Sequence, residues 1–115
     1  MTAVRKIPAT PEALRAVLTE IAPHRLADFD EARAKATGQA REATDPTPLR
    51  IFTETWAVEV AIERNPDAAA RLRTLEHKAD VVTDVAEARD IVRQISAIRR
   101  TAAVAAGVLP ADTAR

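Results

Sequence analysis

The sequence predicts an all-α domain, a small antiparallel bundle of four to five helices. Apolar side chains recur at every third or fourth position, no segment alternates as a strand does, and the 115 residues include only two glycines. Proline also follows a capping residue at Thr10-Pro11, at Asn65-Pro66 and at either Asp45-Pro46 or Thr47-Pro48, a pattern typical of helix starts. Short connections between such helices favour antiparallel neighbours.

The bundle is expected to be organised around a central helix at about 48–64, which carries the only tryptophan, Trp56. One apolar stripe has helical spacing at positions 49, 52, 56 and 60. A second runs through positions 51, 58 and 62 and is bridged by Thr55. A helix that is apolar on two sides needs neighbours on both, so we expect this helix to be buried.

Two helices are predicted before it. Residues 1–9 are expected to form a loose N-terminal arm, followed by a helix that Pro11 opens and Pro23 ends or redirects. The second helix, from His24 to about Thr44, has a weaker pattern because its large apolar side chains stop after Phe29. We expect its second half to be exposed or frayed.

The segment after the central helix is predicted to be helical from Pro66 to Ala106. The pattern leaves open whether this is one long helix or two helices separated at 80–84, with Thr83 as the cap of the second. Gly107 stands where a left-handed C-terminal cap belongs. The expected organisation is therefore a single helical domain over 10–107 and a disordered tail over 108–115.

Composition narrows the class of protein. The chain has no cysteine, which excludes disulfides and thiolate zinc sites. Its 17 basic and 17 acidic residues leave no net field to attract nucleic acid or an anionic membrane. No run approaches 18 apolar residues and no leader pattern is visible, so we expect a cytoplasmic protein. Much of the hydrophobic content is alanine, which predicts a thin core that a partner completes or that is marginally stable alone.

No residue pattern indicates catalysis, a cofactor or a metal, so we expect no enzyme, no cofactor and no small-molecule substrate. His24 and His77 are interpreted as surface residues. The carboxylate pairs Asp28/Glu31 and Glu59/Glu63 share helical faces, but acid–base work needs a pocket that shifts their pKa values. We favour a solvated face for both pairs.

A basic stripe is the most distinctive polar feature. Arg89, Arg93 and Arg100 fall on the side of their helix opposite Ile91, Arg99 adds to them, and no acid occurs from 91 to 111. The alternatives are a solvated face, an acidic protein partner or, less favoured because acids lie nearby and no aromatic is interleaved, nucleic acid.

The order of features resembles that of a known family. The segment Ile21-Ala-Pro-His-Arg-Leu-Ala-Asp-Phe-Asp-Glu-Ala, the helix from Leu49 to Val60 around Trp56, and Asn65-Pro-Asp-Ala68 resemble a family of small actinobacterial helical proteins of unknown function. The resemblance covers about residues 8–75. Members are often encoded beside RelE/ParE-like toxins, which implies an antitoxin role and offers no catalytic residues to carry over.

We therefore expect a protein-interaction module, with an antitoxin-like inhibitor of a small partner protein as the leading hypothesis. Asp28, Asp30 and Glu31 are the candidate residues for a basic partner, and Arg89, Arg93 and Arg100 are those for an acidic one. The alternative is a self-associating structural or regulatory bundle in which a second copy completes the core. A nucleic-acid binder through the stripe from Arg89 to Arg100 ranks behind both.

Overall fold

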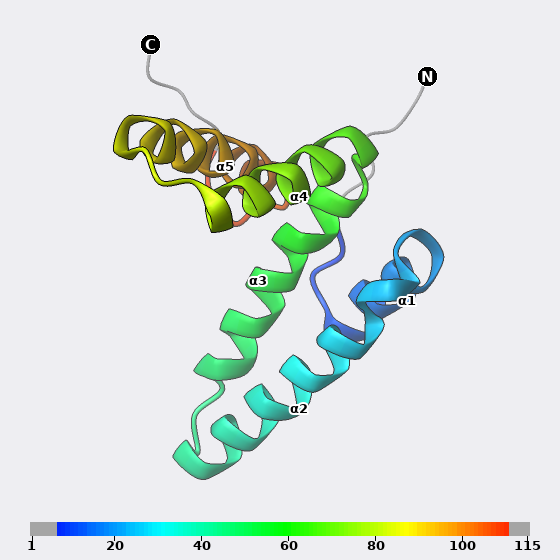
Figure 1. The fold of residues 1–115 in the computed structure, drawn as a ribbon. Helices are drawn as coiled ribbons and strands as arrows, with labels where there is room; N and C mark the ends of the chain where they lie inside the picture. The colour runs from blue at the N-terminus through cyan, green and yellow to red at the C-terminus, as the bar shows by residue number, and fades with distance from the viewer. Residues whose placement is uncertain (1–6, 111–115) are drawn as a thin grey trace.

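The computed structural model describes residues 7–110 and confirms the all-α prediction. Within that range the chain forms five α-helices, one short 3-10 helix and no strand (Figure 1). The elements are α1 (Pro11–Ile21), η1 (Pro23–Arg25), α2 (Leu26–Ala43), α3 (Thr47–Glu63), α4 (Pro66–Val81) and α5 (Val85–Ala105).

The first three helices form one packed unit, here called the N-terminal lobe. Helices α2 and α3 run antiparallel and α1 packs against both (Figure 1). Phe29 of α2 lies between the two aromatic residues of α3, with ring centres 5.1 Å from Phe52 and 5.2 Å from Trp56 in edge-on geometry. Leu14, Leu18 and Val60 close the core around them. The predicted central position of Trp56 is confirmed.

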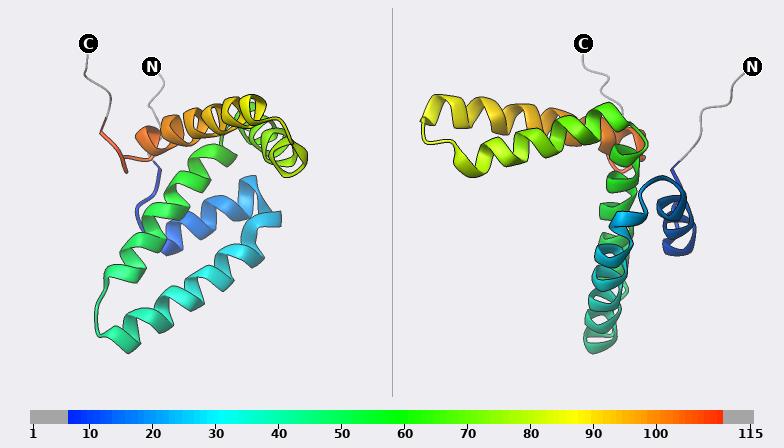
Figure 2. Two further views of the ribbon diagram at one scale, coloured as in Figure 1. Left: turned by 60° about the vertical axis from the view of Figure 1, so that its left-hand side comes forward. Right: turned by 45° about the vertical axis from the view of Figure 1, so that its right-hand side comes forward.

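Helices α4 and α5 form an antiparallel hairpin that leaves the end of α3 at a steep angle, so that the molecule is L-shaped (Figure 2). A second and smaller core joins the hairpin to α3 through Ile62, Ala69, Leu72 and Ala102. The far end of the hairpin, around residues 81–85, projects away from the lobe (Figure 2).

The helix boundaries follow local chemistry. The side chains of Thr10 and Asn65 accept hydrogen bonds from the amides of Ala13 and Ala68, which caps α1 and α4 as predicted. Asp45 accepts from the amide and hydroxyl of Thr47 and so fixes the start of α3. Gly107 adopts a φ of 78° directly after α5, the left-handed conformation expected there.

Residues 66–106 form two helices, and two expectations are wrong: the cap of the second of these helices and the burial of the second stripe of α3. The cap of the second helix is Asp84, whose carboxylate accepts from the amide of Glu87 at 2.8 Å, instead of Thr83. The second stripe of α3 is only partly covered. Ile62 is buried and Val58 half-buried beneath α5, but Ile51 is 54% exposed because the hairpin reaches only the C-terminal half of α3.

The second half of α2 is not frayed, since the helix continues to Ala43, but it is largely exposed, as one of the two expected alternatives had it, and it buries only Ala36. At the chain ends, Ile7 and Val108 pack against the lobe core. Residues 1–6 of the expected arm and residues 111–115 of the expected tail lie outside the described residues. Among the described residues, no helix is both long enough and apolar enough to cross a membrane.

Candidate interaction surface

A cluster of charged side chains fixes the hairpin against the lobe. Arg25 of η1 donates to Glu63 at 2.8 Å and to Glu59 at 3.1 Å, both on α3. Its guanidinium carbon also lies 5.0 Å from the centre of the Trp56 ring. Burial alone lowers the pKa of Arg25, but the hydrogen bonds and charges of the two carboxylates outweigh that effect and raise it. Arg25 therefore stays charged.

Glu59 is shared between the two parts of the molecule. Its second oxygen accepts from Arg99 of α5 at 2.9 Å, and Arg99 also reaches Glu76 of α4 at 3.5 Å. The side chains of Glu59 and Glu63 are only 14% and 8% exposed, so the interpretation of this pair as a solvated face is wrong. Arg99 likewise turns toward Glu59 and does not belong to the exposed basic stripe.

The far end of the hairpin exposes apolar side chains. Helix α4 ends at Val81, within a run of three β-branched residues at 81–83. The amide of Val82 makes the last hydrogen bond of the helix, to the carbonyl of Lys78. Val81, Val85 and Val92 are 66%, 64% and 59% exposed. They account for half of the six large hydrophobic residues exposed among the described residues. An apolar group of this kind on a projecting element is typical of an interaction site.

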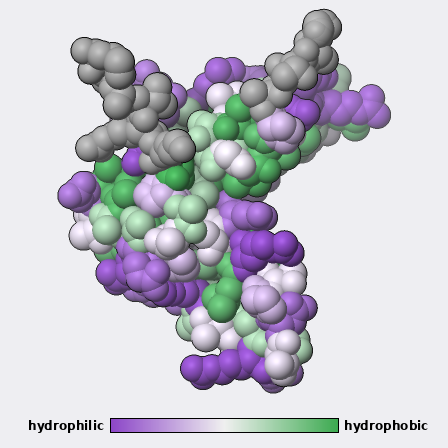
Figure 3. All heavy atoms as spheres, turned by 180° about the vertical axis from the view of Figure 1, so that it is seen from behind, coloured by the Kyte–Doolittle hydropathy of each residue, from purple (hydrophilic) through white to green (hydrophobic). Residues whose placement is uncertain are grey.

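Two of the predicted arginines join these valines. An open hollow of about 550 Å³ is lined by Val82, Thr83, Asp84, Val85, Ala88, Arg89, Val92 and Arg93. We call Val81, Val85, Val92, Arg89 and Arg93 the hairpin-end surface. Arg93 has a loose contact of 3.4 Å with Asp90, and both side chains are more than half exposed. Seen from behind, hydrophobic surface alternates with hydrophilic surface along the hairpin (Figure 3).

The other predicted site residues lie elsewhere. Arg100 is exposed farther along α5. Asp28, Asp30 and Glu31 are exposed on α2, which among the described residues packs against neither α4 nor α5. Asp30 is already paired with Arg15 at 2.8 Å, and this hydrogen bond lowers the pKa of Asp30. The acidic and basic candidates therefore belong to two separate surfaces.

The three valines were missed by the sequence reasoning, although a signal was present. Val85 and Val92 are seven residues apart, about two turns of helix. They therefore share a side of α5 with Arg89 and not with the buried Ile91. That spacing identifies a second apolar face on α5, separate from its core face.

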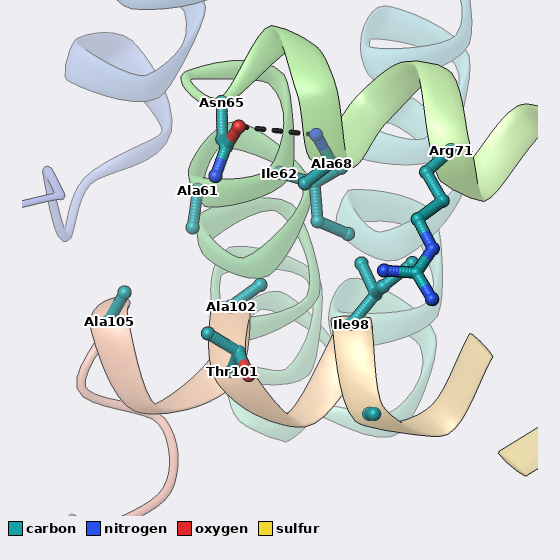
Figure 4. A pocket seen from close by; sticks show the side chains of 10 residues that line it. Ala61, Ile62, Asn65, Ala68, Arg71, Ile98, Thr101, Ala102 and Ala105 are labelled. Carbon is teal, nitrogen blue, oxygen red and sulfur yellow. Dashed lines mark hydrogen bonds between the residues drawn. The ribbon is translucent and has the colours of Figure 1, made fainter. Parts of the chain in front are cut away.

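A second hollow, of about 330 Å³, lies where α3, α4 and α5 meet (Figure 4). Half of the residues that line it are alanines, including Ala61, Ala68 and Ala105. The side chain of Asn65 is engaged by the amide of Ala68 (Figure 4), and Arg71 donates to Gln94 at 2.9 Å. The side chains of Asn65 and Arg71 are thus engaged in contacts within the fold.

No family model, curated protein or solved structure matches this chain.

Proposed function

We propose that the protein is an interaction module that binds a protein partner through the hairpin-end surface. The observation that carries this proposal is the exposure of Val81, Val85 and Val92 on an element that projects from the lobe. A valine that stays exposed contributes no free energy of burial to the fold of its own chain. Burying each against a partner is worth roughly 1 to 2 kcal/mol, which makes this the surface with most to gain from contact.

The arginines suit the same role. Arg89 and Arg93 flank the valines, and arginine combines a long apolar stem with a planar group that bonds carboxylates. A protein surface that offers apolar side chains with carboxylates beside them is complementary to this arrangement. Asp84, Glu87 and Asp90 lie close by and reduce the positive field, which favours protein over nucleic acid as the partner.

The antitoxin role implied by the family resemblance is an alternative to this proposal, because it uses a different surface. It requires a small basic partner that contacts Asp28, Asp30 and Glu31 on α2. Asp28 and Glu31 are exposed, whereas Asp30 must exchange Arg15 for a cation of the partner. The two surfaces make different predictions, so one experiment separates them.

Affinity capture of the tagged chain from its host tests the proposal when it is run with matched variants. Val92→Asp should abolish capture of the partner. Ile51→Asp is the control, because Ile51 is similarly exposed but lies on α3, and it should capture as the wild type does. Retention of the same partner by a Val85→Asp/Val92→Asp double variant contradicts the proposal. The triple change Asp28→Asn, Asp30→Asn and Glu31→Gln should weaken capture only if the partner is a basic protein bound at α2.

A further inference from the structure

We propose that the ion pair between Glu59 and Arg99 is a latch that holds the hairpin at its angle to the lobe, and that release of this latch lets the hairpin change its angle while both parts stay folded. The pair joins α3 of the lobe to α5 of the hairpin at 2.9 Å. Three properties of the junction carry this proposal: its narrow apolar contact, the alternative partners of the two charged groups, and the exposure of Arg99. The motion needs no partner protein and is therefore independent of the proposed function.

The hairpin packs against a single helix of the lobe. Among the described residues, α3 packs against α4 and α5, whereas α1 and α2 pack against neither. The chain passes from lobe to hairpin through Arg64 and Asn65, and Val108 packs against the lobe core just after α5 ends. Both attachments lie at the same end of the hairpin, so its far end moves when the angle at the junction changes. Hinges commonly consist of a few such residues at the ends of helices.

The apolar contact at this junction is small. Its buried residues are Ile62, Leu72 and two alanines, Ala69 and Ala102. Residues that extend it, among them Ile98, are only half-buried. Open hollows of about 330 and 370 Å³ border the contact, and Ile62 lines both of them. Small side chains with free space beside them allow packed helices to slide slightly, as they do in shear motions.

Both charged groups of the latch have a second partner within their own part of the molecule. Glu59 also accepts from Arg25 of the lobe at 3.1 Å, and Arg99 also donates to Glu76 of the hairpin at 3.5 Å. When the pair separates, Glu59 keeps Arg25 and Arg99 keeps Glu76. Breaking a buried ion pair is unfavourable mainly because it leaves a charge without a partner, and that does not happen here. The junction can therefore exchange between a locked and a released arrangement.

Arg99 is the group that releases. Its side chain is 41% exposed, against 14% for Glu59 and 23% for Arg25. Dissolved salt screens exposed charges more than buried ones, so it acts on Arg99 first. Arg25, by contrast, also bonds Glu63 and lies over the ring of Trp56. Rising ionic strength should therefore separate Glu59 from Arg99 before it separates Glu59 from Arg25.

The distance between two spin labels tests the latch. Gln39 of α2 and Lys78 of α4 are exposed. Because the chain has no cysteine of its own, a Gln39→Cys/Lys78→Cys chain takes labels at these two positions only. Pulsed electron spin resonance should give one main distance for this chain at low salt. Arg99→Gln should raise the share of a second distance about fivefold, the effect expected of a partly exposed ion pair. Arg100→Gln removes the neighbouring exposed arginine and, as the control, should leave the distribution unchanged.

A salt titration of the same labelled chain provides a second measurement. Molar sodium chloride should populate the second distance when Arg99 is present, and should change little in Arg99→Gln, which has no latch to screen. Because the titration needs no substitution at the junction, it tests the latch even if Arg99→Gln loses the helical circular dichroism of the wild type.

An unchanged distance in a folded Arg99→Gln chain overturns the proposal, as does a distribution that salt leaves unaltered when Arg99 is present. A second distance that salt produces equally with and without Arg99 also contradicts it, because the latch is then not the cause. These results are distinct from failure of the proposed function. A hairpin fixed at one angle that still captures a partner, in a manner that Val92→Asp abolishes, refutes the latch and leaves the interaction module standing.

Discussion

The N-terminal lobe and the hairpin are both helical, but they differ in how far their apolar side chains are buried. In the lobe, Phe29, Leu14, Leu18 and Val60 are 0% exposed, and three aromatic rings contact one another. At the far end of the hairpin, three valines are about as exposed as the charged residues beside them. The lobe completes its own core, and the hairpin leaves apolar surface for another molecule.

The difference follows from which side chains each part has available. The aromatic rings of the lobe each bury more apolar area than an alanine of the hairpin can, because buried area scales with side-chain size. The lobe also packs three helices around one core, whereas the far half of the hairpin has two helices and no third neighbour. Stability is therefore expected to reside in the lobe and binding in the hairpin.

The largest expected effect comes from opening the lobe core. Phe29→Ala removes the ring that contacts both Phe52 and Trp56 and should cost about 3–5 kcal/mol of unfolding free energy. Ile91→Ala, in the hairpin, should cost about 2 kcal/mol, at the low end for such a change, because fewer side chains surround it. Urea unfolding followed by Trp56 fluorescence compares the two. Equal losses contradict the division between lobe and hairpin.

An intermediate effect is expected at the junction of the two parts. Glu59→Gln removes the charge that Arg25 and Arg99 share, and leaving half-buried guanidinium groups poorly paired should cost about 1–3 kcal/mol. Glu76→Gln is the matched control, since its side chain is 50% exposed and its contact with Arg99 is 3.5 Å long. That control should change the unfolding free energy by no more than about 0.5 kcal/mol. The same urea titration measures both, and a larger loss for Glu76→Gln argues against the role given to Glu59.

The smallest effect is expected from acid, and it concerns the lobe surface. The hydrogen bond from Arg15 lowers the pKa of Asp30 below its ordinary value of 3.8. A carboxyl with a depressed folded-state pKa contributes stability above its ordinary pKa, and this contribution is lost as the pH falls through the folded-state value. Arg15→Gln should therefore lower the urea midpoint slightly at neutral pH and not at a pH well below 3.8. Lys35→Gln, also at an exposed position, controls for the loss of one cation. A difference between Arg15→Gln and wild type that persists in strong acid rules out this linkage.

The features that the sequence predicted well are those with local causes. Thr10 and Asn65 bond amides three residues away, and Gly107 needs only its own backbone freedom. The stripe through Phe52, Trp56 and Val60 has helical spacing, and the structure buries all three. In each case the sequence signal comes from residues within a few positions of one another.

The features that sequence reasoning missed depend on distant partners. Glu59 meets Arg25 and Arg99, which are 34 and 40 residues away, so spacing alone gave no sign that the carboxylate is half-buried. A pattern shows which side of a helix is apolar, but not whether a neighbour reaches it. Ile51 and Val92 both have apolar spacing, and both stay exposed. The hairpin does not reach Ile51, and Val92 lies on a different side of α5 from Ile91, which is buried.

The most direct test of the central claim, that the hairpin end is incomplete without a partner, is amide hydrogen exchange of the dilute wild-type chain. Segments from residues 79–92 should exchange through local opening, well before segments from residues 52–60, which should exchange only when the whole lobe unfolds. Addition of the partner, or a rise in concentration if the partner is a second copy, should slow exchange in 79–92 and leave 52–60 unchanged. Equally slow exchange in both regions of the isolated chain would contradict the account, because a hairpin that is already stable has no core left to complete.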